Sequence, residues 1–345
     1  MNRVLVEAER NTRSAAERKL VIYSSSMVKG RAIVGHATVL EELERDLEAL
    51  NVAHAYLFSG PEHIGKTNVA HWFATELLLK GVPEEKHENV QTRMEKLTHP
   101  DFLSLDQLWI EGVCEDWDTI AKTSNAPQQH RAKKPAAKTD VISIDDVRSL
   151  QERLYETGTG QYRCCFIRAV GRMQTAAANA FLKILEEPPE GLVFLLTTQS
   201  FSTLPPTIIS RTRVVRMQRL SYAELAPLLE DAEEEDRKFI LHIAQGAPGT
   251  ICALRDNPDL LREHKLLHSK AFSFWQSHSL KDRLQILVHL HKRGEESDRF
   301  LLHLALTIRE HEVSSGGVKA FNRLVRGLGT NAHRQLLAQQ FALSV

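Results

Sequence analysis

The pattern of hydrophobic and polar positions divides the chain into an alternating part and a helical part. Up to residue 220, five apolar runs have the length of buried strands, and they occupy residues 55–58, 102–105, 163–167, 192–198 and 214–217. Amphipathic helical segments lie between these runs, such as 39–50, whose leucines recur at helical spacing. Strands that alternate with helices predict an α/β fold with a parallel sheet and crossover helices.

Beyond residue 220 the pattern predicts helices alone. The pattern predicts a small helical region at 225–254, which is broken at 246–249. It predicts further helices at 259–344, which are split near Gly294 and at 314–317. We therefore expect four parts along the chain: an N-terminal extension (1–30), an α/β domain (31–220), a helical lid (221–257) and a C-terminal helical domain (258–345). Residues 5–20 could form a helix within the extension. Residues 121–138 are rich in Ala, Pro and Lys, which predicts a flexible insertion.

One loop carries the clearest chemical signal. The apolar run 55–58 leads into Gly60-Pro61-Glu62-His63-Ile64-Gly65-Lys66-Thr67, and a helix follows from about Asn68. Gly-x-x-x-x-Gly-Lys-Thr between a strand and a helix is the pattern of a P-loop, whose backbone N–H groups surround a phosphate. Lys66 is expected to reach the β- and γ-phosphates, and the Thr67 hydroxyl to ligate Mg²⁺. We therefore predict that these eight residues bind ATP or ADP, with or without Mg²⁺.

The composition limits the class of protein. The chain has 345 residues, of which 42% are hydrophobic and 26% charged, as in ordinary globular proteins. Lys+Arg and Asp+Glu both number 44, so the formal net charge of +0 provides no overall basic field for binding nucleic acid unaided. The apolar runs are too short for a membrane span, and the N-terminus lacks the apolar core of a signal peptide. We therefore expect a cytoplasmic protein without membrane contact.

The four cysteines argue against a Cys₄ zinc site. Cys164 and Cys165 are adjacent in an apolar run, and neighbours on a strand point to opposite faces, so both are predicted to be packing residues. No C-x-x-C pair is present, and the histidines at 63, 87 and 99 lack the spacing of metal ligands. We therefore expect no zinc.

With its elements in this order, the chain resembles the bacterial clamp-loader subunits of DNA polymerase III, and most closely the delta-prime family. The matching stretches are 33–36, 54–60, 99–101 and, most specifically, 176–189, which ends in Glu-Glu-Pro-Pro. Ser210-Arg211-Thr212 stands where the family has Ser-Arg-Cys. The resemblance covers the chain from Ile33 onward. It implies an AAA+ core at 31–220, a helical lid and a C-terminal collar that holds a ring of subunits together.

The resemblance also implies partners and residue roles. Arg211 corresponds to an arginine finger that enters the ATP site of a neighbouring motor subunit, and Thr197 or Thr198 to a sensor of the γ-phosphate. Arg213, close by, is expected to tolerate substitution better than Arg211. The implied partners are the motor and clamp-opening subunits of the loader. The sliding clamp and primed DNA would be reached through the assembly.

The chain departs from the active members of this family at three places. In those members the strand that corresponds to 163–167 ends in two acidic residues, one that helps to hold Mg²⁺ and one that positions the attacking water, whereas this chain has Arg168 and Ala169. Thr250 stands where relatives that hydrolyse ATP often carry an arginine. The four-cysteine zinc module after the P-loop helix is missing from 81–96. We therefore expect an accessory subunit of the polymerase that binds nucleotide but has lost its own ATPase activity.

Two other interpretations stay open. The chain could be an active AAA+ ATPase, such as the motor subunit of the loader, although Arg168 and Ala169 argue against it. Alternatively, it could belong to another P-loop class, such as the nucleotide kinases. The helical C-terminal third argues against that class. Steady-state ATPase of the purified chain would separate the motor from the non-motor interpretation.

Overall fold

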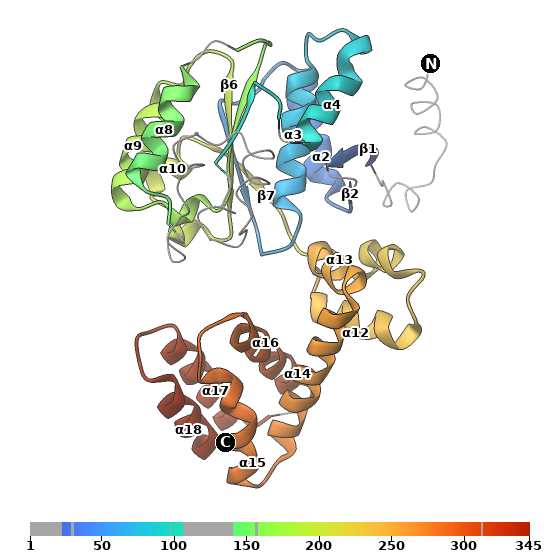
Figure 1. Cartoon of the computed structure of the whole chain (residues 1–345), viewed down its shortest axis with the longest axis vertical. Coiled ribbons are helices and arrows are strands. Elements are labelled where there is room, and N and C mark those ends of the chain that lie inside the picture. The colour runs from blue at the N-terminus through green and yellow to red at the C-terminus, as the bar shows by residue number, and fades with distance from the viewer. Residues whose placement is uncertain (1–22, 29–30, 97, 106–140, 156–157, 312) are drawn as a thin grey trace. The chain divides into compact units, whose positions relative to one another are not determined.

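The computed structural model of the protein describes residues 23–28, 31–96, 98–105, 141–155, 158–311 and 313–345 (Figure 1). The predicted helix at 5–20 and the predicted insertion at 121–138 lie outside these residues. The chain forms two compact units. One runs to Glu230 and includes Ala244–Gly249, and the other contains Asp231–Ile243 and Thr250–Val345. The predicted lid at 221–257 is thus divided between the two units, and its existence as a separate domain stays a prediction.

A five-stranded parallel sheet forms the centre of the first unit. In spatial order its strands are β4 (Phe102–Leu105), β5 (Arg163–Ile167), β6 (Leu192–Thr198), β3 (Ala55–Ser59) and β7 (Arg213–Arg216). Every neighbouring pair is parallel, so the C-terminal ends of all five strands meet at one edge. The predicted fold class, an α/β P-loop core with a parallel sheet followed by helices, is confirmed.

Helices cover both faces of this sheet (Figure 1). One face packs against α8 (Ile144–Leu154), α9 (Thr175–Glu186) and α10 (Pro206–Ile209). The other packs against α2 (Ala37–Glu48), α3 (Lys66–Leu79) and α4 (His87–Glu95). Short 3₁₀ helices complete the unit at η2 (Glu84–Lys86), η3 (Val170–Arg172), η4 (Phe201–Thr203) and η5 (Ala226–Leu229), beside the single-turn α11 (Tyr222–Leu225).

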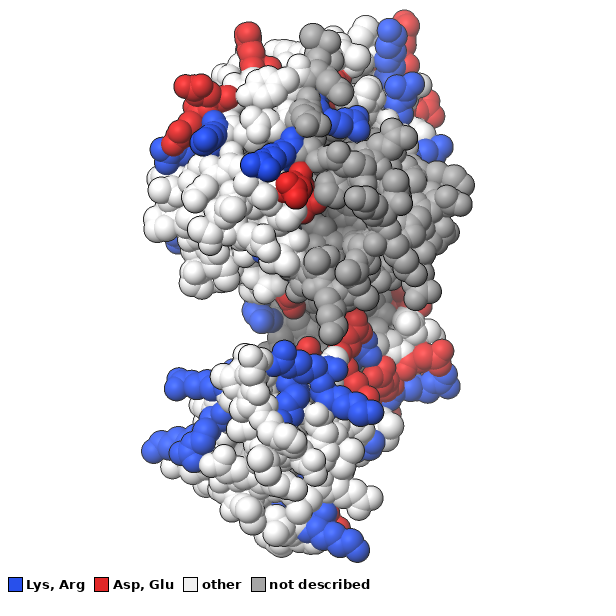
Figure 2. All heavy atoms as spheres, turned by 60° about the vertical axis from the view of Figure 1, so that its left-hand side comes forward, with Lys and Arg blue, Asp and Glu red and all other residues white. Residues whose placement is uncertain are grey.

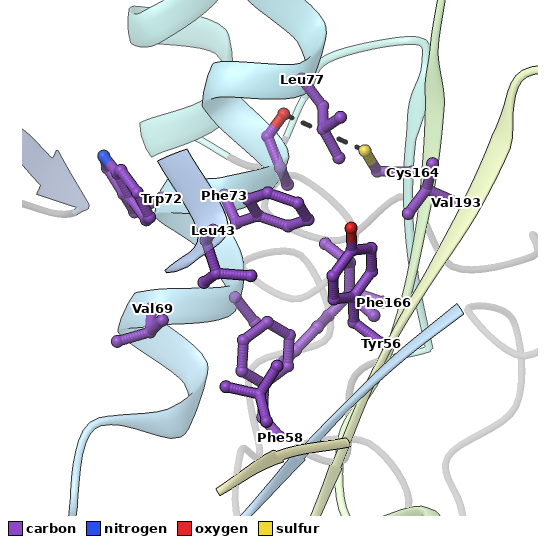
Figure 3. Close-up of a cluster of buried hydrophobic side chains, with 14 of the residues drawn as sticks. Leu43, Tyr56, Phe58, Val69, Trp72, Phe73, Leu77, Cys164, Phe166 and Val193 are labelled. Atoms are coloured by element: carbon purple, nitrogen blue, oxygen red, sulfur yellow. Dashed lines mark hydrogen bonds between the residues drawn. The ribbon is translucent and has the colours of Figure 1, made fainter. Parts of the chain in front are cut away.

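Side chains alternate between the two faces along each strand. Leu57 enters the core beneath α8 and α9, whereas Tyr56 and Phe58 enter the core beneath α2 and α3 (Figure 3). Cys164 and Cys165 are both fully buried, one in each core, which confirms the prediction that they are packing residues. Aromatic side chains pack around Tyr56, whose ring centroid lies 4.7 Å from that of Phe73, so β3 is buried in this core directly before the loop that follows it.

The predicted N-terminal extension (1–30) contains a strand that the sequence pattern does not predict. β1 (Tyr23–Val28) pairs antiparallel with β2 (Arg31–Ile33), with Tyr23 opposite Ile33. A run of serines is a weak strand signal by itself. Here the strand is formed by its pairing with β2, which a local pattern does not reveal.

The second unit is helical, as predicted. It contains most of α12 (Glu234–Ala244) and α13 (Pro248–Asp256), followed by α14 (Pro258–Gln276), α15 (Leu280–Ile286), η6 (Leu287–Leu290), α16 (Glu295–Glu310), α17 (Ser315–Leu328) and α18 (Arg334–Ser344). The predicted breaks are present: Gly294 precedes α16 with φ 153°, and the Ser314 hydroxyl accepts the Gly317 N–H at 3.2 Å at the start of α17. Among the described residues, no helix has the length and apolar character that crossing a membrane requires.

Candidate nucleotide site

The predicted P-loop joins the C-terminal end of β3 to the first turn of α3. The loop spans residues 60–65, and α3 begins at Lys66, slightly earlier than the sequence pattern indicates. His63 and Gly65 have left-handed backbone conformations, with φ of 56° and 99°. A left-handed residue followed by a helical one curls the chain so that neighbouring N–H groups form an anion-binding concavity. The positive end of α3 lies at the same place and favours a phosphate there.

The two glycines of the motif are required for different reasons. Gly65 has open space around it, but its φ of 99° is strained for any residue with a Cβ. Gly60 lies directly against the end of β7, where an added Cβ would collide with the Met217 carbonyl oxygen. The Gly65 constraint comes from the backbone conformation of the loop, and the Gly60 constraint comes from its packing against the segment that follows β7.

Lys66 already points back across the loop. Its Nζ donates a hydrogen bond to the Gly60 carbonyl at 2.7 Å and a second one to the Pro61 carbonyl. Burial is the main influence on this amine and lowers its pKa, while the charge of Glu62 acts in the opposite direction. The ammonium group is therefore held within the loop by carbonyl oxygens that a phosphate could replace as its partner.

Three neighbouring segments hold the backbone and tip of the loop. The Nε2–H of His36, which is buried, donates to the Ile64 carbonyl at 2.9 Å. The Gly249 N–H donates to the His63 carbonyl at 2.8 Å, and Gln199 donates to the Glu62 carboxylate. The stretch 33–36 matches the family by resemblance alone, and the bond from His36 gives that stretch a physical role.

The end of β6 connects the P-loop with the end of β5. The Thr198 carbonyl accepts the Gly60 N–H at 3.3 Å, while its hydroxyl donates to the Ser200 carbonyl at 3.0 Å. Thr197 contacts the other neighbour, because its Oγ1 accepts the Ala169 N–H at 3.0 Å. The residues after β5 therefore lie at the same edge of the sheet as the P-loop, one strand away.

Arg168 and Ala169 occupy the turn directly after β5, where the resemblance would place two acids. Neither side chain carries a carboxylate, so neither can ligate Mg²⁺ or accept a proton from an attacking water. Ala169 also has a left-handed backbone, with φ 52°. This turn can therefore supply a guanidinium toward a phosphate, but it supplies neither of the two acidic groups.

Arg211 lies toward the end of the sheet where the strands begin, opposite to the end that carries the P-loop. β7 runs parallel to β3, with Arg213 opposite Tyr56 and Arg216 opposite Ser59. Arg211 precedes β7, whereas the P-loop follows Ser59, so at least about 10 Å of strand separates the two along the sheet. The structure therefore does not bring Arg211 together with the P-loop residues of its own chain.

The Arg211 side chain is oriented by α9 and α10. Its Nη2 lies 2.6 Å from the Glu186 carboxylate, and its Nη1 donates to the Thr207 carbonyl at 3.2 Å. Glu186 belongs to the Glu-Glu-Pro-Pro stretch that carried the resemblance, and no local pattern indicates that it pairs with Arg211. The side chains are 35% and 50% exposed, so the guanidinium remains accessible to another protein.

Another matching stretch, 99–101, lies away from this site. Asp101 precedes β4, at the edge of the sheet where the strands begin. It is buried, accepts the Thr159 N–H at 3.0 Å and lies 3.9 Å from the Arg163 guanidinium. Asp101 thus holds the entry to β5 in place and has no part in the nucleotide site.

Comparison with known proteins gives a consistent set of relatives. A family model described as "DNA polymerase III, delta subunit" matches residues 35–221, more than half of the chain. DNA polymerase III subunit tau of Bacillus subtilis is 24% identical over 295 residues, which cover 85% of this chain and 46% of that protein. The gamma/tau subunit of Mycobacterium tuberculosis is 33% identical over 184 residues, 52% of this chain and 27% of that protein. The chain thus spans less than half the length of these two relatives.

Solved structures show a similar arrangement at low sequence identity. A gamma subunit-related protein of DNA polymerase III from Thermotoga maritima has a TM-score of 0.49 at 18% identity, covering 88% of this chain and 97% of that chain. The RuvB Holliday junction branch migration motor of the same organism has a TM-score of 0.43 at 15% identity, covering 85% and 78%. At these values the similarity adds nothing about activity.

Proposed function

The chain belongs to the DNA polymerase III delta subunit family, and from this premise we propose that it is a non-motor, delta-prime-like subunit of the clamp loader. In this role it helps to load the sliding clamp onto primed DNA as part of an assembly with motor and clamp-opening subunits. It binds ATP or ADP through residues 60–67, and Thr198 senses the γ-phosphate. It contributes Arg211 to the ATP site of a neighbouring subunit and hydrolyses nucleotide negligibly itself.

The observation that carries the non-motor role is the turn after β5. The Ala169 N–H donates to the Thr197 hydroxyl beside the P-loop strand, so this turn lies at the same edge of the sheet as the P-loop, where the resemblance implies catalytic acids. It carries Arg168 and Ala169 instead, and losing a water-positioning base alone costs roughly 10²–10⁴ in rate. The P-loop keeps both glycines and Lys66, so phosphate binding does not depend on the missing acids.

The position of Arg211 supports action on a partner. Its distance along the sheet from the P-loop of the same chain makes it unsuited to that site, whereas its guanidinium is exposed. An arginine that stabilises charge on the γ-phosphoryl oxygens can be supplied by a second protein. We therefore assign Arg211 to a neighbouring motor subunit.

Contact with DNA is assigned to the assembly. The net charge is +0, and on the visible face of the second unit some Lys and Arg side chains gather in one group while others lie apart among uncharged ones (Figure 2). Affinity for a phosphate backbone rises with the number of phosphates that are contacted together. A continuous basic surface is therefore expected to require several subunits.

The motor subunit itself is the second candidate, because the relatives named above are tau and gamma/tau subunits. Steady-state ATPase of the purified chain separates the two functions. The non-motor proposal predicts turnover at background level that Lys66→Ala does not lower further. Turnover that depends on Lys66 would establish the motor function instead. Co-purification with motor and clamp-opening subunits tests membership of the loader independently, and failure to assemble would overturn both.

A further inference from the structure

A cluster of histidines with one carboxylate lies in the second unit, away from the nucleotide site. It brings together His242 of α12, His268 of α14 and Glu310 of α16. One ligating atom from each of the three side chains lies within 4.8 Å of the other two. These residues are far apart in the sequence, so spacing along the chain does not reveal the grouping.

The distances fit a small divalent cation. Zinc–nitrogen and zinc–oxygen bonds of about 2.0–2.1 Å in tetrahedral geometry place neighbouring ligand atoms about 3.3 Å apart. His268 Nε2 lies 3.4 Å from one Glu310 oxygen, and His242 Nε2 lies 2.9 Å from the other. Small rotations of these side chains would let all three atoms face one ion. The His242 and His268 side chains are 39% and 18% exposed, which leaves access for the ion and for a water as fourth ligand.

Two further histidine side chains, His303 and His264, continue from the Nδ1 side of the His268 ring as a chain of imidazoles. His268 Nδ1 lies 3.3 Å from His303 Nδ1, and His303 Nε2 lies 3.0 Å from His264 Nδ1. If His268 donates from Nδ1, His303 accepts at Nδ1 and donates from Nε2, and His264 accepts at Nδ1. Every hydrogen bond in the chain is then satisfied, and the lone pair of His268 Nε2 faces Glu310. Ligating histidines commonly donate their other N–H to such an outer partner, which fixes the tautomer and the ring orientation.

We propose that His242, His268 and Glu310 form a binding site for a divalent transition-metal ion of the zinc class, with His303 and His264 orienting His268. Two imidazoles and one carboxylate are ligands that suit zinc. The ion would join α12 to α14 and α16, so its effect is on the stability of the second unit. This replaces, for the second unit, the expectation of no zinc, which rested on cysteine content and on spacing along the sequence.

The same side chains have a rival arrangement without metal. If every donor in the imidazole chain is reversed, His268 donates from Nε2 to Glu310, and the group is a hydrogen-bonded cluster only. The two arrangements differ in whether His268 Nε2 has a lone pair available, so metal affinity distinguishes them.

The test uses the tag-free full chain after treatment with a chelator. Zn²⁺ is titrated in competition with a chromophoric chelator, and Co²⁺ is added separately to read the coordination from its visible absorption. One equivalent of tight zinc and the intense absorption of four-coordinate Co²⁺ are expected. His268→Gln and Glu310→Gln should each weaken zinc binding by at least about 100-fold, the upper end of what loss of an outer-shell partner costs.

His289→Gln is the matched control, because His289 pairs with Glu296 at 2.6 Å in the same unit but outside the cluster. It should bind zinc like the wild type. Circular dichroism checks that each variant is folded, and His242→Gln provides a further variant at a more exposed position. Zinc should raise the melting temperature of the wild type and the control, but not that of the cluster variants. Zinc binding that is absent in the wild type, or unchanged in folded cluster variants, would overturn the proposal.

Discussion

Substitution of Arg211 by alanine is the sharpest test of the proposed role in the loader, because its effects on folding and on catalysis differ widely in size. In the structure the guanidinium forms an ion pair with the Glu186 carboxylate at 2.6 Å, and both side chains are substantially exposed. Exposed pairs of this kind contribute about 0–1 kcal/mol to the free energy of unfolding. Arg211→Ala should therefore leave the melting temperature and assembly of the loader almost unchanged.

The expected effect on catalysis is much larger. An arginine finger contributes roughly 10³–10⁵ to the rate of phosphoryl transfer, which corresponds to about 4–7 kcal/mol of transition-state stabilisation. The loader is reconstituted with its motor subunits, and ATP turnover is measured with the clamp and primed DNA present. Turnover at the site that receives Arg211 should fall by this factor. The total rate of ATP turnover by the loader should therefore fall to the rate that its remaining ATP sites contribute.

Two further variants separate catalysis from local structure. Glu186→Gln removes the ionic partner but keeps the guanidinium, so it should retain most of the turnover. Arg148→Ala is the matched control, because Arg148 forms an exposed pair with Asp145 at 3.5 Å on α8. If Arg211→Ala assembles normally and turns over ATP like the wild type, the finger assignment is refuted and the subunit acts structurally.

Three other predictions concern the first unit. Lys66→Ala should weaken ATP binding at least about tenfold by calorimetry, because a charge-assisted phosphate contact is lost, and Mg²⁺ should strengthen binding less than in a relative with acids after β5. Gly60→Ala should abolish nucleotide binding and lower the melting temperature, since its Cβ would collide with the Met217 carbonyl; an unchanged melting curve would contradict this. Arg213→Ala should lower the free energy of unfolding by about 1–3 kcal/mol in urea titrations, because it leaves Asp46 buried without its ionic partner; adding Asp46→Asn should recover part of the loss.

The sequence predicted the parts of the fold that depend on local patterns. Strands β3, β5 and β6 are continuous apolar runs, and their burial on both sides follows from that composition. The end of α9 was marked by two prolines, and the helix stops at Glu186. The strand–loop–helix order of the P-loop also follows from a local pattern, so the start of α3 was predicted to within two residues.

Contacts between distant segments could not be predicted in the same way. The structure places Arg213, which is expected to tolerate substitution better than Arg211, 2.6 Å from Asp46. Asp46 is a buried residue of α2 that also accepts a hydrogen bond from the Tyr56 hydroxyl at 3.1 Å. The pairing depends on β7 lying beside β3, which the sequence pattern does not specify. The grouping of His242 with Glu310 has the same cause, because helices from separate parts of the chain supply it.

The P-loop is proposed to bind phosphate and also joins several segments of the fold, and these two roles can be separated by residue. The backbone of the loop receives bonds from His36 and Gly249, and its first N–H binds the Thr198 carbonyl. A chain that had lost nucleotide binding would therefore still need the backbone conformation that the two glycines permit. The Lys66 ammonium is different, because its hydrogen bonds within the described part of the chain go to carbonyls of its own loop, and burying an ammonium group costs free energy. If Lys66→Ala unfolds at the same temperature as the wild type but has lost its affinity for ATP, this lysine acts in nucleotide binding. If Lys66→Ala is less stable and the wild type itself has no affinity for ATP, the loop has a structural role alone.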